Sequence, residues 1–514
     1  MTARTVMVQG TASSVGKSLV VTALCRIFSR AGLRVAPFKA QNMALNSAVA
    51  EGGGEIGRAQ AVQAEAAGIA PSIDMNPILL KPEGDARAQV VVMGRPIGSL
   101  QAVEYHARKP ELTGVIAEAL ARLRAQVDLV VIEGAGCPAE INLKDRDIVN
   151  MHVARVANAP VLLVGDIDRG GVFAALVGTM ELLEPDERAR VAAFVVNRFR
   201  GDRRLLEPGL ELLARRTGVP VLGVLPYLRD LRIADEDSAS LDDRRDRAAR
   251  AGELEIAVVR LPRISNHDDL EPLEHESGVA VRYVTRPEGL EAADLVVLPG
   301  SKCTASDLGW LRESGIAAAV TARGTRGQPV LGICGGCQML GTDLLDPHRV
   351  ESAEERVAGL GLLALATRFL RDKTTAQVHA SLAAPSFLGE QHAAVSGYEI
   401  HTGAVERLAG TMPALEIVSR NGASCREPDG AITAGGAVVG TLVHGLFENE
   451  GVRSALLASL RSRRGLPAPR APALPTRDAE YDRLARAVIE NVDWQSLCRI
   501  AGVAPPRPSF GSPP

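Results

Sequence analysis

Short apolar runs recur along the first half of the chain, separated by stretches long enough for a crossover helix. An apolar run without polar alternation is typical of a strand that is buried on both faces of a parallel sheet. The runs that we interpret as such strands are 5–9, 34–37, 128–133, 160–166, 191–197 and 219–225. They predict an α/β domain with a doubly wound parallel sheet.

A second series of such runs follows a charged stretch and predicts a second α/β domain; its strands are 255–261, 279–284, 294–298, 329–333 and 437–444. Farther on, apolar residues at helical spacing predict an amphipathic helix that docks on the body. The expected divisions are a first domain at 1–228, a charged linker at 229–252, a second domain at 253–463, a Pro/Ala linker at 464–476, a helix at 477–497 and a disordered tail at 498–514.

The composition is that of a globular protein, with 46% apolar residues among 514 and a net charge of -3. So little net charge and only 3% aromatic residues provide neither the basic field nor the stacking surfaces that nucleic-acid binding uses. We expect no nucleic-acid partner, and no apolar run reaches the length of about 18 residues that a membrane span needs. Seven irregularly spaced cysteines and an N-terminus without a signal-peptide pattern predict a cytoplasmic protein.

The first predicted strand leads into a glycine-rich loop that starts at Gly10-Thr11, ends at Gly16-Lys17-Ser18 and is followed by a helical pattern. This is the context of a phosphate-binding loop, whose backbone N–H groups and lysine hold the phosphates of a nucleotide such as ATP. The spacing is one residue longer than the strict Gly-x4-Gly-Lys form. We expect the Ser18 hydroxyl to bind Mg²⁺.

Two polar residues close later strands of the same predicted sheet. Glu133 would lie at the carboxyl end of its strand, where ligands bind in such sheets, and is a candidate second Mg²⁺ ligand. The alternative is a surface carboxylate that only closes the strand. Asn197 is a candidate for hydrogen bonding a nucleotide base, and a simple turn asparagine is an equal alternative.

In the second domain, Cys334 follows a strand, is flanked by glycines and precedes a helical pattern, as a nucleophile on a sharp turn does. His444 ends another strand and is the expected acid/base. We expect the backbone around Gly335, and the loop at Gly300-Ser301, to face the oxyanion.

Three neighbouring positions complete the set of candidates. Gln338 is assigned to the glutamine site, and Cys337 is expected to pack in the core. His401 is a candidate for catalysis, and the alternative is a structural or substrate-lining role. The CxxC pair has no second pair or His cluster at zinc spacing, so no protein-bound transition metal is expected.

These motifs together resemble one family. The second domain is similar to a class I glutamine amidotransferase, through Gly-Ile-Cys334-Gly-Gly and Val-His444-Gly-Leu-Phe, and the first looks like the dethiobiotin-synthetase type of ATP-dependent ligase. That order of domains resembles the cobyrinate and cobyrate amidases of vitamin B12 synthesis. Four further stretches carry the resemblance, at 39–47, 75–82, 133–143 and 397–401.

The chain departs from the amidotransferase pattern in two places. Many members carry His-x-Glu, which completes a Cys-His-Glu triad, whereas Leu446 stands two residues after His444. We therefore expect a Cys334–His444 dyad whose ring is oriented by a backbone carbonyl or water. The second departure is Cys337, where the family usually has an aromatic residue, and we expect it to be neutral.

The resemblance implies amidation of the b, d, e and g carboxylates of adenosylcobyrinic acid a,c-diamide, with ATP and Mg²⁺ as cofactors and glutamine as the nitrogen donor. Cobalt belongs to this corrinoid substrate. The residues taken as corrinoid or phosphate contacts are Lys39, Gln41, Asn42, Asn46 and Lys81. Whether the chain forms a homodimer is left open by the sequence.

Two other functions remain as alternatives. One is the family branch that makes the a,c-diamide, which is disfavoured because it usually has an Asp-containing loop where this chain has Gln41-Asn-Met. The other is a regulatory or partition-type P-loop ATPase with an inert amidotransferase-like domain.

Overall fold

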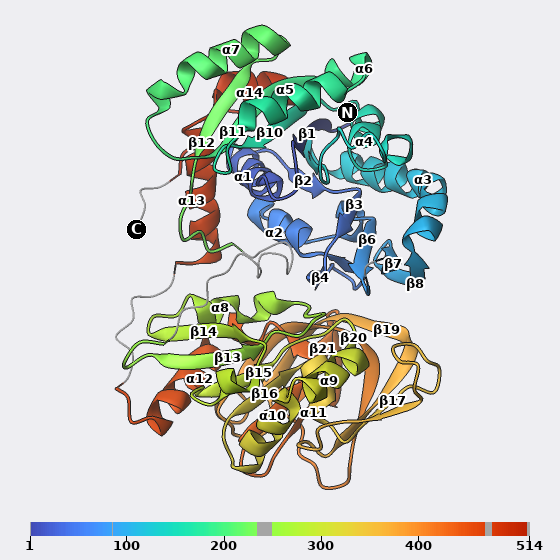
Figure 1. Cartoon of the computed structure of the whole chain (residues 1–514), viewed down its shortest axis with the longest axis vertical. Helices are drawn as coiled ribbons and strands as arrows, with labels where there is room; N and C mark the ends of the chain where they lie inside the picture. The colour runs from blue at the N-terminus through green and yellow to red at the C-terminus, as the bar shows by residue number, and fades with distance from the viewer. Residues whose placement is uncertain (1, 85, 234–248, 468–474, 511–514) are drawn as a thin grey trace.

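The computed structural model describes residues 2–84, 86–233, 249–467 and 475–510 (Figure 1). The described residues form two α/β domains, one above the other in Figure 1, and two C-terminal helices. This is the fold class that the apolar runs predict. Most of the two expected linkers, at 234–248 and 468–474, lies outside the described residues. Within the part of the chain that is described, no helix is long and apolar enough to cross a bilayer.

The first domain is built on a six-stranded parallel sheet of strand order β12-β11-β10-β1-β9-β2. All six predicted strands are present, as β1 (Arg4–Gly10), β2 (Val35–Phe38), β9 (Leu129–Glu133), β10 (Val161–Asp166), β11 (Val191–Phe199) and β12 (Val221–Pro226). The principal helices around it are α1 (Lys17–Arg30), α2 (Arg58–Ala67), α3 (Ala102–Gln126), α4 (Met151–Ala157), α5 (Val172–Leu182) and α7 (Glu207–Thr217).

Successive residues of a strand in this sheet enter different cores. Met7 packs with residues of α3 and α5, whereas its neighbours Val6 and Val8 pack with α1 and the C-terminal helices. All three residues are fully buried. Because side chains alternate between the faces of a strand, a sheet covered on both faces requires apolar residues at every position. This is why the runs lack polar alternation.

The segment between β2 and α3 forms small sheets that the apolar pattern does not predict. Strands β3 (Gln41–Met43), β6 (Ile78–Pro82), β7 (Arg87–Val92) and β8 (Arg95–Gln101) make a four-stranded sheet, and β4 (Ser47–Val49) pairs with β5 (Glu55–Gly57). In Figure 1 these strands lie at the side of the first domain that faces the second. The segment therefore contributes to the domain interface.

The second domain contains a six-stranded sheet of order β14-β13-β15-β16-β24-β23. Its strands are β13 (Leu254–Val259), β14 (Val279–Val284), β15 (Leu295–Leu298), β16 (Val330–Ile333), β23 (Ala431–Ile432) and β24 (Val438–Thr441). Its main helices are α9 (Thr304–Glu313), α10 (Ile316–Thr325), α11 (Gly335–Leu340) and α12 (Glu450–Arg463). All the predicted strands occur, but the run 437–444 is divided into β24 and the short strand β25 (Val443–His444).

A second sheet of this domain is absent from the predicted elements. It has seven strands, including the long antiparallel pair β19 (Leu365–Leu382) and β20 (Ala394–Arg407). The other five are β17 (Asp343–Leu345), β18 (Arg356–Ala358), β21 (Leu415–Arg420), β22 (Ala423–Asp429) and β25. Strand β20 pairs with β25 through Tyr398 and His444, so this sheet reaches the candidate base.

The C-terminal residues correct two expectations. The predicted helix 477–497 is two helices, α13 (Arg477–Ile489) and α14 (Trp494–Ala501), and the expected disordered tail begins inside the second. Leu484 and Val488 of α13 and Leu497 of α14 are buried in the core that contains α1. The chain thus returns to the first domain after completing the second (Figure 1).

Candidate active sites

The glycine-rich loop joins β1 to α1, as a phosphate-binding loop should. Gly16 has φ 93°, a left-handed conformation that L side chains rarely adopt, immediately before the helix begins at Lys17. The Lys17 ammonium donates to the carbonyls of Ala12, at 2.9 Å, and Gly136, at 3.3 Å. Lys17 therefore lies across its own loop, beside the segment that follows Glu133.

Asn197 contacts this loop directly from the end of β11. Its Nδ2 donates to the Val15 carbonyl at 2.8 Å, and a Cβ on Gly16 would lie 2.2 Å from the same nitrogen. The side chain is thus a support for the loop backbone and not a turn asparagine. Gly16 is needed here both for its φ and for this close approach.

Glu133 is buried at the end of β9 and is the centre of a polar cluster. It accepts hydrogen bonds from Ser18 Oγ at 2.9 Å, from Lys39 Nζ at 2.8 Å and from Gln63 Nε2. The hydroxyl and the carboxylate that we expected at Mg²⁺ are therefore adjacent. Oxygen donors from one or two side chains, completed by phosphate and water, suit Mg²⁺. A group of three or more His, Cys, Asp or Glu side chains placed for a metal does not occur among the described residues.

The five candidate corrinoid contacts divide into two groups. Lys39 pairs with Glu133 beside the phosphate loop, Gln41 accepts from the Tyr105 hydroxyl, and Asn42 donates to Gln60; all three contacts lie within the first domain.

Asn46 and Lys81 lie instead inside the domain interface, where they are 0% and 3% exposed. Asn46 contacts His267, and Lys81 pairs with Glu55 at 2.6 Å. Burial does not separate these two from the first group, since Lys39 and Asn42 are also only 4% and 2% exposed; their place at the domain interface does.

In the second domain, β16 delivers Cys334 to the turn before α11. Cys334 has φ 51° and ψ -109°, a strained conformation for a residue with a Cβ, as the nucleophile turn predicts. Gly336 allows α11 to approach β15 closely, since a Cβ there would lie 1.9 Å from the Leu298 carbonyl oxygen. The Cys334 thiol lies 3.5 Å from the Ile400 carbonyl oxygen.

His444 is oriented by a carboxylate, which corrects the expectation of a dyad oriented by a carbonyl or water. Its Nδ1 lies 2.6 Å from Asp269 Oδ2, and the Gly445 N–H donates to the other Asp269 oxygen at 2.8 Å. Asp269 is 3% exposed. The site therefore contains a Cys-His-Asp arrangement, whose acid precedes the other two residues in the chain.

The imidazole is stabilised in its charged form. Burial disfavours the charge, but the electrostatic attraction of Asp269 and Cys334, and the hydrogen bonds that the ring N–H groups donate to both, raise the pKa of His444 well above the ordinary 6.5. Tyr398 stacks on the ring, with centroids 5.2 Å apart and an interplanar angle of 13°. The ring is thus held by an acid at Nδ1 and by an aromatic face.

The candidate oxyanion loop lies beside the nucleophile. A Cβ on Gly335 would lie 2.9 Å from the Ser301 backbone nitrogen, and one on Gly300 would lie 3.2 Å from His444 Cε1. The Ser301 hydroxyl donates to Asp307 at 2.6 Å and accepts from the Cys303 N–H. It therefore fixes the loop, and its backbone is the part of Ser301 that lies next to Gly335.

A cavity of about 40 Å³ adjoins Cys334, room for only a few water molecules. It is lined by Gln338, Glu351 and His401 of the second domain and also by Lys81 of the first. Gln338 Oε1 accepts from Thr304, while its buried Nε2 has no hydrogen-bond partner among the described residues. His401 lines this cavity, with Nδ1 2.7 Å from the Gly403 carbonyl.

Sequence reasoning missed Asp269, Gln63 and Glu351. Asp269 lies ten residues after strand β13 ends, whereas Glu133 is the last residue of its strand. The strand-end rule that identified Glu133 therefore does not extend to Asp269. Gln63 and Glu351 carry no comparable signal, because a helix glutamine and a loop glutamate are usually solvent contacts.

Two family models match this chain. Residues 6–241 match the CobQ/CobB/MinD/ParA nucleotide binding domain, and residues 255–452 match the CobB/CobQ-like glutamine amidotransferase domain. The chain is 65% identical to a cobyric acid synthase of Sorangium cellulosum, over 98% of this chain and 99% of that one. It is 50% identical to a cobyric acid synthase of Pelotomaculum thermopropionicum, over 98% of each.

Proposed function

The chain belongs to the family of cobyric acid synthases, ligases with a glutamine amidotransferase domain, and we propose that it amidates the b, d, e and g carboxylates of adenosylcobyrinic acid a,c-diamide. ATP activates each carboxylate and glutamine supplies the nitrogen. The observation that carries the proposal is that one chain holds a phosphate loop beside a buried carboxylate and, separately, a Cys-His-Asp site.

The first domain activates the carboxylate. The substrate oxygen attacks the γ-phosphorus of ATP, ADP leaves, and an acyl phosphate forms. Lys17 and the loop N–H groups stabilise the charge on the transferring phosphoryl group. Ser18 and Glu133 would hold Mg²⁺, which supplies further charge neutralisation at the phosphates. Lys39, Gln41 and Asn42 remain the proposed contacts to the corrinoid or its phosphorylated carboxyl group.

The second domain releases ammonia. The Cys334 sulfur attacks the side-chain amide carbon of glutamine, and His444 donates the proton with which ammonia leaves. Water then cleaves the thioester, with His444 as base, and glutamate is released. The backbone near Gly335 and Ser301 stabilises the oxyanion, and Asp269 holds the tautomer and orientation of His444. Ammonia finally displaces phosphate from the acyl phosphate.

Glutamine recognition is assigned to the polar side chains around the small cavity. Gln338 Nε2 is a donor that suits a carboxylate or carbonyl oxygen of glutamine, and Glu351 is a carboxylate that suits its ammonium group. Thr402 and the Thr304 N–H donate to Glu351 at 2.7 and 3.2 Å, which fixes its position. The cavity must widen for glutamine to enter, because about 40 Å³ does not hold an amino acid.

A regulatory ATPase with an inert second domain is disfavoured by the geometry. An inert domain would have no need for a strained Cys334, or for a buried acid on the far nitrogen of His444. Strain of this kind persists where the surrounding structure over-determines it and is concentrated at functional sites.

The direct test is to incubate the purified protein with the a,c-diamide, glutamine and Mg-ATP and to follow the product masses. We expect four successive amidations, ending at a product with no free b, d, e or g carboxylate. Amidation of only the a and c positions of unamidated cobyrinic acid would assign the chain to the other family branch. ATP hydrolysis without any amide product would contradict the proposal.

A further inference from the structure

The turn that carries Asp269 is contacted by the other domain as well as by its own. It is the short helix η5 (His267–Leu270), preceded by Asn266, whose φ is 51°. Ser47 and Asn266 exchange two hydrogen bonds, at 3.2 and 3.3 Å, and Asn46 lies 3.1 Å from His267 Nδ1. Asn266 and His267, which precede Asp269 in the turn, therefore both contact the first domain.

Asp268, the residue directly before Asp269, also contacts the first domain, through an ion pair. Arg58, the first residue of α2, places its Nε 2.8 Å from Asp268 Oδ2. The side chains are 13% and 1% exposed, so the pair is nearly removed from water. Breaking such a pair by removing one partner leaves a buried charge uncompensated.

Arg58 also faces the aromatic ring that stacks on the base. Its guanidinium carbon lies 6.0 Å from the centroid of Tyr398, within the range of a cation–π contact. The Tyr398 hydroxyl in turn accepts from Asn266 at 3.1 Å. One arginine thus contacts both the residue next to Asp269 in the chain and the ring that stacks on His444.

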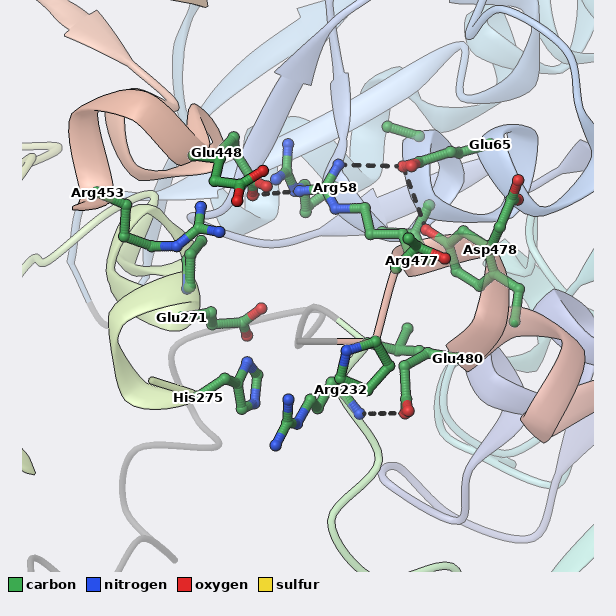
Figure 2. A pocket seen from close by; sticks show the side chains of 18 of the residues that line it. Arg58, Glu65, Arg232, Glu271, His275, Glu448, Arg453, Arg477, Asp478 and Glu480 are labelled. Atoms are coloured by element: carbon green, nitrogen blue, oxygen red, sulfur yellow. Dashed lines mark hydrogen bonds and ion pairs between the residues drawn. The ribbon is translucent and has the colours of Figure 1, made fainter. Parts of the chain in front are cut away.

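The surroundings of Arg58 stabilise its positive charge. Burial works against the charged guanidinium, but Asp268 and the more distant Tyr398, Glu448 and Glu271 raise the pKa of Arg58 above its ordinary value. Its side chain lines a cavity of about 890 Å³ between the domains, together with Glu65, Glu448 and Arg477 (Figure 2). It is absent from the lining of the small cavity at Cys334.

From these contacts we propose that Arg58 of the first domain is a positioning residue for the Asp269–His444 pair, so that glutamine hydrolysis depends on the domain interface. The proposal rests on the proposed function of the Cys334 site. Helix α2 also presents Gln63 to Glu133, so the same helix contacts both candidate active sites.

Arg477 offers a matched control. It lines the same cavity and joins the same two domains, since it pairs with Glu65 of α2 at 3.3 Å and with Glu448 of the second domain. No hydrogen bond or ion pair described for Arg477 involves η5, Tyr398 or His444. A residue that merely holds the domains together should behave like Arg477.

The experiment measures kcat and KM for glutamine hydrolysis, and amide synthesis from ammonium, in full-length wild type, Arg58→Ala, Arg58→Lys and Arg477→Ala. We expect Arg58→Ala to lower glutaminase kcat by about 10²-fold, the scale of a small misplacement of catalytic groups. KM for glutamine and the ammonium-dependent rate should stay close to wild type. Arg58→Lys, which keeps the charge, should recover much of the lost kcat.

Three results would overturn the proposal: an unchanged kcat in Arg58→Ala, an equal loss in Arg477→Ala, or a Lys variant no better than the Ala variant. If Arg58→Ala does not fold, Asp268→Asn removes the other partner with little change of shape and decides the question by the same kcat. Failure of the proposed function looks different, because wild type itself would then hydrolyse no glutamine.

Discussion

Asp269 is the single residue that makes the glutaminase site a Cys-His-Asp arrangement and not a Cys-His dyad. Asp269→Asn keeps the size of the side chain but removes the charge that orients His444 and stabilises its protonated form. We expect glutaminase kcat to fall by about 10²-fold or more, as for acids that fix the tautomer of a catalytic histidine. His444→Ala should cost at least as much, and both should spare synthesis from ammonium.

Glu448 is the control for Asp269, because it is the acid nearest to His444 downstream in the sequence. Its carboxylate pairs with Arg477 and makes no described bond to the imidazole. Glu448→Ala should therefore cost far less glutaminase activity than Asp269→Asn. Equal losses would show that the carboxylate at Nδ1 is not what orients the ring.

The same substitution predicts a shift in the pH profile. Asp269 and Cys334 raise the pKa of His444, so the imidazolium persists to higher pH than a free histidine would. Removing the Asp269 charge lowers that pKa, and the alkaline limb of kcat/KM for glutamine should move to lower pH. An alkaline limb that stays in place, or moves to higher pH, would contradict this assignment.

Lys17 is the residue-scale test of the other site. Lys17→Ala should reduce synthesis by about 10³-fold with glutamine or ammonium alike, because it removes the charge that we propose contacts the transferring phosphoryl group. The measurement is the rate of amide formation at saturating Mg-ATP. Rates equal to wild type would remove Lys17 from the mechanism.

At the scale of elements, the turn from β16 into α11 depends on glycine for space. Gly336→Ala would place a Cβ 1.9 Å from the Leu298 carbonyl oxygen, which neither backbone can avoid without moving. We expect a loss of about 3 kcal/mol in stability, the upper part of the range for overpacking, together with loss of glutaminase activity. Thermal unfolding and glutamine hydrolysis measure the two effects.

Gly309 in α9 is the matched control for Gly336. It is also a glycine within a helix of the same domain, but nothing lies within 4 Å of where its Cβ would be. Gly309→Ala should therefore raise the melting temperature slightly, by the usual helix preference of alanine over glycine. Similar destabilisation by both substitutions would mean that the close approach to Leu298 is not the cause.

The elements also show what could be predicted from the sequence. Strands such as β1 and β16 are buried on both faces, so their sequences are uninterrupted apolar runs that can be recognised without the structure. Strand β19 alternates between buried and exposed residues over much of its length and includes a charged segment around Lys373, so it carries no such run. Helix α14 is not separated from α13 in the prediction, because its first residues fall inside the predicted helix 477–497 and the rest adjoin the Pro-rich end of the sequence.

The candidate sites also divide into residues that local motifs reveal and residues that only the fold brings together. Cys334, Lys17 and Ser18 belong to local motifs, in which a strand, a turn and a helix start are consecutive in the chain. Asp269 lies 175 residues from His444 and comes to it only through the packing of the domain. The resemblance names Lys81 as a corrinoid or phosphate contact, and the structure pairs it with Glu55 at an interface that the sequence does not reveal.

At the scale of the whole molecule, the two domains perform separate chemical steps and share an interface at the glutaminase site. Lys81 lines the cavity of Cys334, and Glu55 pairs with Lys373 of the second domain at 2.5 Å. Helices α13 and α14 return to the core of the first domain. The arrangement keeps the ammonia-releasing and carboxylate-activating sites in one body, with residues of the first domain at the edge of the glutaminase site.

The central claim, that ammonia release and amide synthesis belong to different domains, is tested most directly by Cys334→Ala. The measurement is amide formation on the a,c-diamide with Mg-ATP and either glutamine or ammonium. We predict that the glutamine-dependent rate is abolished while the ammonium-dependent rate stays at the wild-type level, because the phosphate loop and Glu133 are untouched. Loss of both rates in a folded Cys334→Ala protein would contradict the account.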